Sequence, residues 1–293
     1  METMNFSLSE ILLVAQKENW AVGHFNISNL EQLRAIMEAA KNLKCPVMIG
    51  LSEGERKFVG LKQAAAIVKS FKEEYDLPVF LNPDHSHSVE SAKEAFDAGF
   101  DSVHIDLSKL PFEENIKGTK EVADYVKSKN PEVSVEGELG YLRGESRVQK
   151  EIIKIKPEDL TKPEEAAEFA EKTGVDRFAG AYGNSHGISL DEPALDVERI
   201  RAVRMALPER VAMVLHGGSG IPDNQIKEAI KAGISNIHVN TEIRTAYAEA
   251  LRKFLAENPE ENTPYKILAP TVEAVRIKVE EKLKLFGNNN KII

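Results

Sequence analysis

The chain has 293 residues, of which 42% are hydrophobic and 29% charged, as is typical of a globular protein with one large domain or two small ones. Its formal net charge of −9, without a basic block, argues against nucleic acid or an anionic membrane surface as the main partner. No apolar run approaches the roughly 20 residues of a membrane span. The single cysteine, Cys45, and the lack of a recognisable signal peptide predict a cytoplasmic location.

Helical and extended patterns alternate from the N-terminus onward. The sequence Ser7-x-x-Glu10 is a capping box that predicts the start of a helix, and an apolar run at 21–26 predicts the first strand. Further capping boxes at Ser28 and Thr161 predict two more helix starts. Seven further short apolar segments predict strands at 46–52, 78–85, 102–108, 134–140, 178–186, 211–217 and 237–240.

Eight βα units in a chain of this length predict a (β/α)8 TIM barrel within the α/β class. A doubly wound open sheet is the alternative, but no Gly-rich dinucleotide turn follows the first strand. We expect a single domain over 1–287, a flexible tail over 288–293, and an extra C-terminal helix over 272–285. The longest insert, 141–162, is predicted to be a mobile loop.

In such a barrel, polar residues at the carboxyl ends of the strands meet at one mouth. Five of the seven histidines lie at or near these ends. Three of them, His85, His186 and His216, come from three different strands and are predicted to bind a divalent metal, by default zinc. Each histidine alone is explained as well by a hydrogen-bonded core or loop residue, so the metal site is predicted from their joint position.

Two neighbouring features of the strand ends also suggest chemistry. Asp84 precedes His85 and is a candidate general base and acid beside the metal, although it could instead cap the next helix. The Gly-rich segment 216–220 and the pair Asn240-Thr241 follow the last two predicted strands, where barrels often bind phosphate. A plain tight turn is the alternative for the Gly-rich segment.

Several motifs together resemble those of the class II, metal-dependent ketose-bisphosphate aldolases, and the similarity covers nearly the whole chain. The motifs are Ala-Val-Gly-His-Phe-Asn at 21–26, Gly-Phe-Asp-Ser-Val-His-Ile-Asp at 99–106, Leu-Pro-Phe-Glu-Glu-Asn at 110–115, Val-Glu-Gly-Glu-Leu-Gly at 135–140, Tyr-Gly-Asn-Ser-His-Gly at 182–187 and His-Gly-Gly-Ser-Gly at 216–220. The resemblance implies a (β/α)8 barrel and zinc-dependent cleavage of a phosphorylated ketose, most simply fructose 1,6-bisphosphate, through a zinc-stabilised enediolate.

The resemblance also implies roles for individual residues. Asp84 would move the proton of the C4 hydroxyl, and Glu138 would join the three histidines as a ligand at a second metal position. The expected substrate and phosphate contacts are Asn26, Ser52, Gly187, Gly217, Ser219, His238, Asn240 and Thr241. A monovalent cation such as Na⁺ or K⁺ and a homodimer or homotetramer are further expectations from the resemblance, as is a role in glycolysis.

Three positions differ from the pattern of that family. His238 replaces an asparagine that contacts the substrate, and Ser146 lies where a glutamate assists proton transfer, so Glu145 is the candidate for that role. Tyr265 lies where an arginine binds the second phosphate, and Lys266, Arg56 and Lys57 are candidates to supply the charge. These differences leave open a tagatose- or sedoheptulose-type substrate or a non-catalytic sugar-phosphate-binding protein. A metal-dependent hydrolase on the same barrel is a separate alternative.

Overall fold

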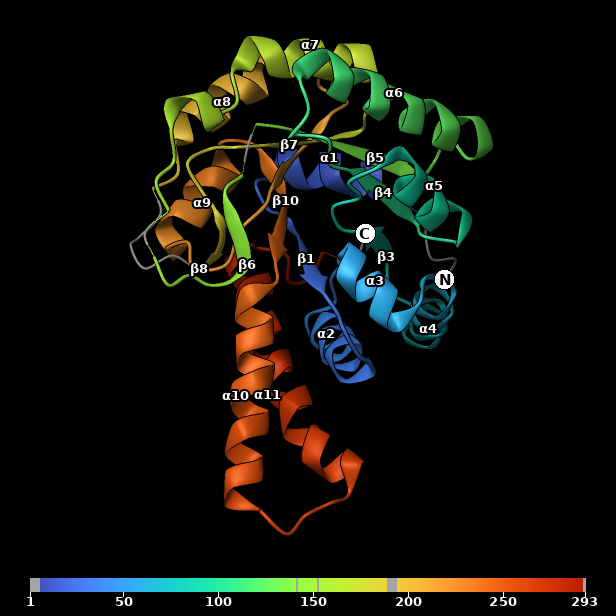
Figure 1. Ribbon diagram of the computed structural model, residues 1–293, viewed down its shortest axis with the longest axis vertical. Coiled ribbons are helices and arrows are strands. Elements are labelled where there is room, and N and C mark those ends of the chain that lie inside the picture. Colours follow the sequence, from blue (N-terminus) through green and yellow to red (C-terminus); the bar gives the residue numbers. More distant parts are fainter. Residues whose placement is uncertain (1–5, 141, 152, 189–193, 292–293) are drawn as a thin grey trace.

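The computed structural model describes residues 6–140, 142–151, 153–188 and 194–291. Eight parallel strands form one sheet in the order β3-β2-β1-β10-β9-β7-β5-β4, which curves into a barrel (Figure 1). The strands are β1 (Val22–Asn26), β2 (Val47–Leu51), β3 (Val79–Pro83), β4 (Ser102–Ile105), β5 (Ser134–Leu139), β7 (Arg177–Gly180), β9 (Ala212–Leu215) and β10 (Ile234–Val239).

The two ends of this sheet meet at β3 and β4. The backbone N–H of Ser86 donates to the carbonyl of His104 at 3.1 Å, and the N–H of Asp106 donates to the carbonyl of Ser86 at 2.8 Å. A parallel bridge between Ser86 and Ile105 accompanies these bonds. The predicted (β/α)8 barrel is therefore confirmed.

Helices surround the barrel, as the βα repeat requires. They are α1 (Leu8–Glu18), α2 (Leu30–Leu43), α3 (Glu53–Val59), α4 (Leu61–Tyr75), α5 (Val89–Asp97), α6 (Phe112–Lys129), α7 (Pro163–Thr173), α8 (Val197–Ala206), α9 (Asp223–Lys231), α10 (Thr241–Glu257) and α11 (Pro264–Leu285), with a 3₁₀ turn at Pro157–Asp159. A large apolar cluster lies between strands and helices and includes Phe25, Ile49 and Val135. Among the helices of the described ranges, none is both long and apolar enough to cross a membrane.

Helix α1 covers the amino-terminal end of the barrel. Its Leu8 and Leu12 belong to a separate apolar cluster with Val22, Met48 and Phe80 from the first residues of the strands. The cluster closes this end of the barrel with apolar side chains, so solvent approaches from the opposite, carboxyl end.

Only one of the three predicted capping boxes is correct. Ser7 and Glu10 form the box at α1. The N-cap of α2 is Asn29 instead of Ser28, because the Asn29 side chain accepts from the backbone of Gln32. Thr161 caps no helix, because its buried hydroxyl donates to the Leu139 carbonyl of β5 and accepts from the backbone N–H of Ala181, just after β7.

Helices α10 and α11 form a long hairpin that projects from the barrel (Figure 1), which we call the arm. The extra C-terminal helix is longer than expected, because it begins at Pro264 instead of residue 272. The tail beyond Gly287, for which we predict flexibility, contacts the body of the protein over residues 288–291. Asn288 is fully buried and donates to the Pro46 carbonyl, and the backbone of Asn290 donates to Leu43.

The predicted mobile loop after β5 has some regular structure of its own. Its residues form β6 (Gly144–Val148), which pairs in parallel with β8 (His186–Ile188) in a second, small sheet. The predicted strand 178–186 is accordingly divided between β7 and β8. This small sheet brings the insert beside His186, at the mouth of the barrel.

Candidate active site

A cavity of about 350 Å³ opens at the carboxyl ends of the barrel strands. Every residue that the sequence predicts for the site lines it, apart from the three candidates for the second-phosphate charge and Glu145, whose side chain lies outside the described part of the chain. The lining residues from that set are Asn26, Ser52, Asp84, His85, Glu138, His186, Gly187, His216, Gly217, Ser219, His238, Asn240 and Thr241. Segments far apart in the sequence therefore meet at one place.

The three imidazoles of the predicted metal set face the same region. The ring of His85 lies 4.6 Å from that of His216 and 5.0 Å from that of His186, and the rings of His186 and His216 are 6.3 Å apart. Burial, followed by the charges of His85 and His216, lowers the pKa of His186 to about 3. His186 is thus neutral at physiological pH, as a metal ligand must be.

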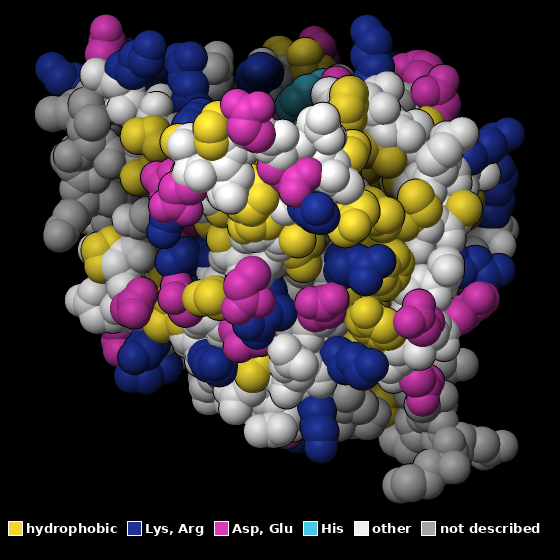
Figure 2. All heavy atoms as spheres, turned by 90° about the horizontal axis from the view of Figure 1, so that it is seen from below, with side chains coloured by type: hydrophobic (Ala, Val, Ile, Leu, Met, Phe, Trp, Pro, Cys, Tyr) yellow, Lys and Arg dark blue, Asp and Glu magenta, His cyan; other side chains and the backbone are white. Residues whose placement is uncertain are grey.

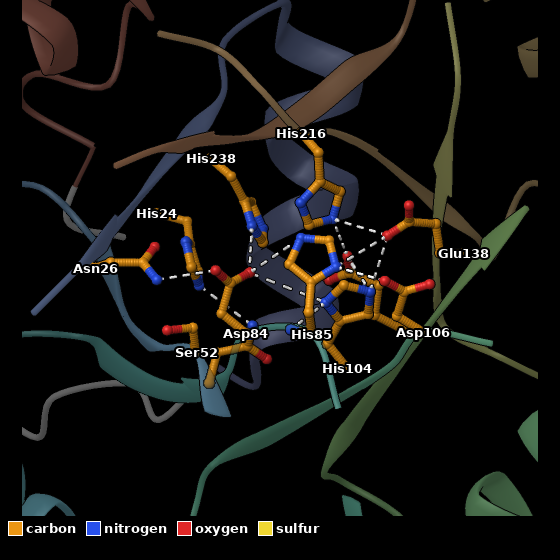
Figure 3. Close-up of polar contacts among 12 residues, drawn as sticks. His24, Asn26, Ser52, Asp84, His85, His104, Asp106, Glu138, His216 and His238 are labelled. Atoms are coloured by element: carbon orange, nitrogen blue, oxygen red, sulfur yellow. Dashed lines mark hydrogen bonds and ion pairs between the residues drawn. The ribbon is translucent and has the colours of Figure 1, made fainter. Parts of the chain in front are cut away.

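Hydrogen bonds to one nitrogen of a ring leave the other nitrogen for a metal. Nδ1 of His85 lies 2.8 Å from the carboxylate of Asp106 (Figure 3). Nε2 of His216 lies 2.8 Å from the carboxylate of Glu136. A carboxylate accepts the proton of the nearby nitrogen, so in the neutral rings Nε2 of His85 and Nδ1 of His216 carry the free lone pairs. Such carboxylate–histidine pairs fix the orientation of metal ligands in proteins.

His104 lies among the candidate ligands, although no role was predicted for it. Together with His85, Glu138 and His216 it forms a group in which one possible ligand atom of each residue lies within 4.8 Å of the others. However, Nδ1 of His104 accepts the backbone N–H of His85 at 3.0 Å. Neutral His104 therefore has its proton on Nε2, which lies 3.3 Å from Glu138. Because Nδ1 of His104 is occupied by the backbone of His85 and its Nε2 carries the proton, neutral His104 has no free lone pair for a metal, and we keep His186 in the ligand set.

Buried carboxylates make this part of the cavity suitable for a cation. The Oε2 atom of Glu138 is buried without a hydrogen-bond partner among the described residues and lies 3.4 Å from Nδ1 of His85. Burial raises the pKa of Glu138 well above its usual value, and the nearby Asp106 raises it further. Because an unpaired buried carboxylate is unfavourable, a divalent ion beside Glu138 would satisfy both its charge and its free lone pairs.

Asp84 and His85 both face the cavity because the strand has already ended. Strand β3 stops at Pro83, and His85 has a left-handed backbone with φ of 49°. The Asp84 carboxylate accepts from Asn26 Nδ2 at 2.9 Å and lies 3.2 Å from His238 Nδ1 (Figure 3). Burial raises its pKa, but the charges of His85 and the hydrogen bond from His238 outweigh burial and hold the pKa well below the usual value. Asp84 is therefore ionised and held in one orientation.

Small residues and a helix N-terminus line the opposite side of the cavity. Gly187 and Gly217 have positive φ angles of 88° and 63°, which favour glycine and place the backbone of both turns close together. Thr241 is the first residue of α10, and its hydroxyl lies 3.1 Å from that of Ser146 on β6. Backbone N–H groups at the start of a helix attract phosphate, as expected for these loops.

None of the three residues predicted to replace the second-phosphate arginine lines the cavity. Arg56 is buried and donates to the Leu51 carbonyl and the Ser91 hydroxyl. Lys266 lies at the tip of the arm and pairs with Glu261 at 3.0 Å, and Lys57 is exposed on α3. The cations that do line the cavity are Lys109, after β4, and Arg244, in the first turn of α10.

The sequence contains one signal that would have revealed more of the site. Alternate residues of a strand face the same side, so the residue two positions before each strand-end polar residue also faces the barrel interior. This rule pairs His24 with Asn26, His104 with Asp106, and Glu136 with Glu138, and all six side chains are buried. Arg177 could not be found in this way, because the predicted strand began at Phe178.

The comparisons with known proteins agree with this geometry. The family model described as fructose-bisphosphate aldolase class-II matches residues 6–291. Relatives named fructose-bisphosphate aldolase from Geobacillus stearothermophilus and from Staphylococcus aureus are each 39% identical over 288 residues, covering 97% of this chain and 98% of theirs. A probable fructose-bisphosphate aldolase from Bacillus subtilis is 39% identical over 287 residues.

Solved structures show the same similarity. The YdjI aldolase from Escherichia coli K12 superposes with a TM-score of 0.84 at 34% identity, and a putative fructose-1,6-bisphosphate aldolase from Coccidioides immitis with 0.87 at 26%. Each comparison covers 98% of both chains. The fold and the site thus define a TIM-barrel aldolase of the metal-dependent class. The chain belongs to the class II fructose-bisphosphate aldolase family, and it is a carbon–carbon lyase.

Proposed function

We propose that this protein is a zinc-dependent aldolase that reversibly cleaves fructose 1,6-bisphosphate into dihydroxyacetone phosphate and glyceraldehyde 3-phosphate. The observation that carries the proposal is the common position of three imidazoles, the Asp84 carboxylate and a phosphate-type helix N-terminus around one cavity. The names of the relatives support the choice of substrate. A cytoplasmic, glycolytic role is part of the same proposal.

The metal would be held by His85, His186 and His216, and Glu138 would offer a second position close to them. The donor set of imidazole nitrogen with an adjacent carboxylate suits zinc. When bound, such an ion supplies a Lewis acid that polarises the C2 carbonyl and stabilises the charge that develops on its oxygen. Asp106 and Glu136 hold the rings of His85 and His216 through their other nitrogens.

Side chains and backbone groups of the protein would transfer the substrate proton and bind the substrate phosphate. The ionised Asp84 removes the proton of the C4 hydroxyl, after which the C3–C4 bond breaks and the aldehyde half leaves. Asn26 and His238 keep the Asp84 carboxylate oriented during this transfer. Gly187, Gly217 and Thr241, with Ser219 and Asn240, would bind the ketone-side phosphate, and Ser52, which lines the same cavity, would contact the far phosphate.

The test is cleavage of fructose 1,6-bisphosphate by the purified protein before and after a strong chelator removes zinc. We expect chelation to abolish dihydroxyacetone phosphate formation and added zinc to restore it. Omitting Na⁺ and K⁺ from the same assay tests the proposed monovalent cation. Full activity in protein shown by elemental analysis to be free of metal would contradict zinc catalysis.

A second candidate concerns the aldehyde half of the substrate. None of the three predicted replacements for the second-phosphate arginine, Arg56, Lys57 or Lys266, lines the cavity of its own subunit, which favours testing other ketoses. A panel of fructose, tagatose and sedoheptulose bisphosphates, compared by kcat/KM, distinguishes these substrates. Binding of all three without turnover would instead indicate a non-catalytic sugar-phosphate-binding protein.

We also propose that the protein is a homodimer or homotetramer assembled through the arm. The arm stands away from the barrel, and its exposed apolar side chains include Leu255 and Tyr265, of which Tyr265 is 73% exposed. The face seen along the arm shows hydrophobic side chains grouped between charged ones (Figure 2). Such a surface is typical of an interface between subunits.

A further inference from the structure

A buried ion pair occupies the middle of the barrel, below the cavity. Nη1 of Arg177 lies 2.6 Å from Oε2 of Glu136, and both side chains are completely buried. Bulky branched residues usually fill this part of a TIM barrel, and removing two charges from water is costly. A charged pair in this place therefore calls for an explanation beyond packing.

Further hydrogen bonds hold the Arg177 guanidinium in one orientation. Its Nη2 donates to Asn82 Oδ1 at 3.0 Å, and its Nε donates to the Ser134 hydroxyl at 3.2 Å. Asn82 is itself fixed, because its Oδ1 also accepts from Ser102 at 2.7 Å. The planar guanidinium thus has partners on two sides in addition to Glu136, and it cannot follow a movement of that carboxylate.

The other oxygen of Glu136 reaches the metal set. Oε1 lies 2.8 Å from Nε2 of His216, whereas Oε2 is the atom that faces Arg177. The two oxygens of this carboxylate therefore have different partners: Oε1 contacts His216, and Oε2 contacts Arg177. The bond to His216 holds a proton on Nε2, which leaves the lone pair on Nδ1 for the metal.

We propose that Arg177 is a positioning residue for the metal: by anchoring Glu136, it holds the His216 ring in the orientation and tautomer that a zinc ligand needs. The inference rests on the proposed metal site. It assigns to the Arg177–Glu136 pair a role in metal binding, in place of a role in stability alone. In this proposal Arg177 contacts Glu136, Glu136 contacts His216, and His216 binds the ion.

The test compares metal binding in four proteins: wild type, Glu136→Gln, Arg177→Met, and the double variant Glu136→Gln/Arg177→Met. Zinc affinity is measured by competition with a chromophoric chelator, and the protein loaded with Co²⁺ gives the visible spectrum of the site. We expect Glu136→Gln to lower zinc affinity about 10–100-fold, as loss of such outer partners does. The Co²⁺ absorption bands should shift, because the orientation of a ligand changes.

The double variant separates an effect on the orientation of the metal ligand from an effect on the stability of the fold. Arg177→Met alone leaves Glu136 charged and unpaired and is expected to lower the melting temperature strongly. The double variant carries no buried charge at either position, so its melting temperature should recover while the zinc affinity and the Co²⁺ spectrum do not. Arg177→Lys, which keeps the cation, should retain zinc affinity better than Arg177→Met.

A matched control is Arg204→Met, which removes a partly buried guanidinium that donates to the carbonyls of Leu207, Pro208 and Val211. It should change stability without changing either metal readout. Zinc affinity within twofold of wild type and an unchanged Co²⁺ spectrum would overturn the inference if they were found in Arg177→Met, or in both Glu136→Gln and the double variant. Wild-type protein that binds neither ion would overturn the proposed function, and the inference with it.

Discussion

Asp84 is surrounded by groups that favour its ionised form. Asn26 donates to one of its carboxylate oxygens, and His238 contacts the other. His238 stacks on His24 with ring centroids 3.6 Å apart and an angle of 8° between the rings. These contacts hold the carboxylate in one orientation beside the histidines of the predicted metal set, as the proposed proton transfer requires.

Replacing Asp84 with asparagine is expected to remove the base and to leave the metal set intact. The asparagine keeps the size of the side chain, so zinc should bind with the stoichiometry of the wild type. Loss of general base catalysis should lower kcat about 10²–10⁴-fold. Steady-state kinetics and elemental analysis of the same preparation measure both effects, and near-normal kcat would refute the role of Asp84.

Protonation of His85 makes the stability of the metal-free protein depend on pH. Burial lowers its pKa, but the carboxylates of Asp84, Glu138 and Asp106 outweigh burial and raise the pKa to about 10. Since the folded-state pKa exceeds the unfolded value of about 6.5, the protonated ring stabilises the metal-free protein fully below that lower pH. This stabilisation is lost as the pH rises through about 10.

Zinc needs the neutral ring, so its binding must displace this proton. At pH 7.5–8 we expect about one proton to be released per zinc bound, measured by calorimetry in buffers of different ionisation enthalpy. His85→Asn should lower this release together with zinc affinity. Proton release near zero in the wild type would show that His85 is already neutral in the metal-free protein.

At the scale of the element, most of the barrel was predictable because strand and helix signals recur in order. The strand ends led to Asp84, His85, His186 and His216, all of which line the cavity. Exact boundaries were less predictable, because they depend on tertiary contacts. The Thr161 hydroxyl bonds across to Leu139 instead of capping a helix, and no local pattern indicates that partner.

The N-cap of helix α2 can be tested in the same terms, because the local pattern predicts Ser28 and the structure has Asn29. Asn29 is its N-cap, and Asn29 also donates to the hydroxyl of Tyr247 on α10. Asn29→Ala is expected to lower the free energy of unfolding by about 0.5–2 kcal/mol. Ser28→Ala, the neighbour in the predicted capping box, should have the smaller effect. Urea unfolding of both variants measures these two losses of stability. A larger loss in Ser28→Ala than in Asn29→Ala would show that Ser28 is the N-cap.

At the scale of the whole molecule, the barrel carries the cavity, and the arm carries the proposed interface between subunits. The amino-terminal end of the barrel is closed by α1, and the carboxyl end carries the cavity. The interior between them is polar, with His24, Glu136 and Arg177 completely buried. Pattern analysis detects the apolar strands, but it does not show which of their polar residues meet across the barrel.

The arm should determine the oligomeric state. Replacing Leu255 with lysine places a charge on its exposed apolar surface and is expected to shift the protein towards monomer in multi-angle light scattering. Met205, which is 87% exposed on α8 of the barrel, provides the control variant Met205→Lys, which should leave the mass unchanged. An unaltered oligomer in the Leu255 variant would place the interface elsewhere.

The most direct test of the central claim is a zinc titration of the metal-free protein, followed by the formation of dihydroxyacetone phosphate from fructose 1,6-bisphosphate. If His85, His186 and His216 hold the catalytic ion, activity should rise in proportion to added zinc and level off at about one equivalent per chain. His216→Ala should show no such rise. Activity that is already maximal before any zinc is added, in protein free of metal, would contradict the account.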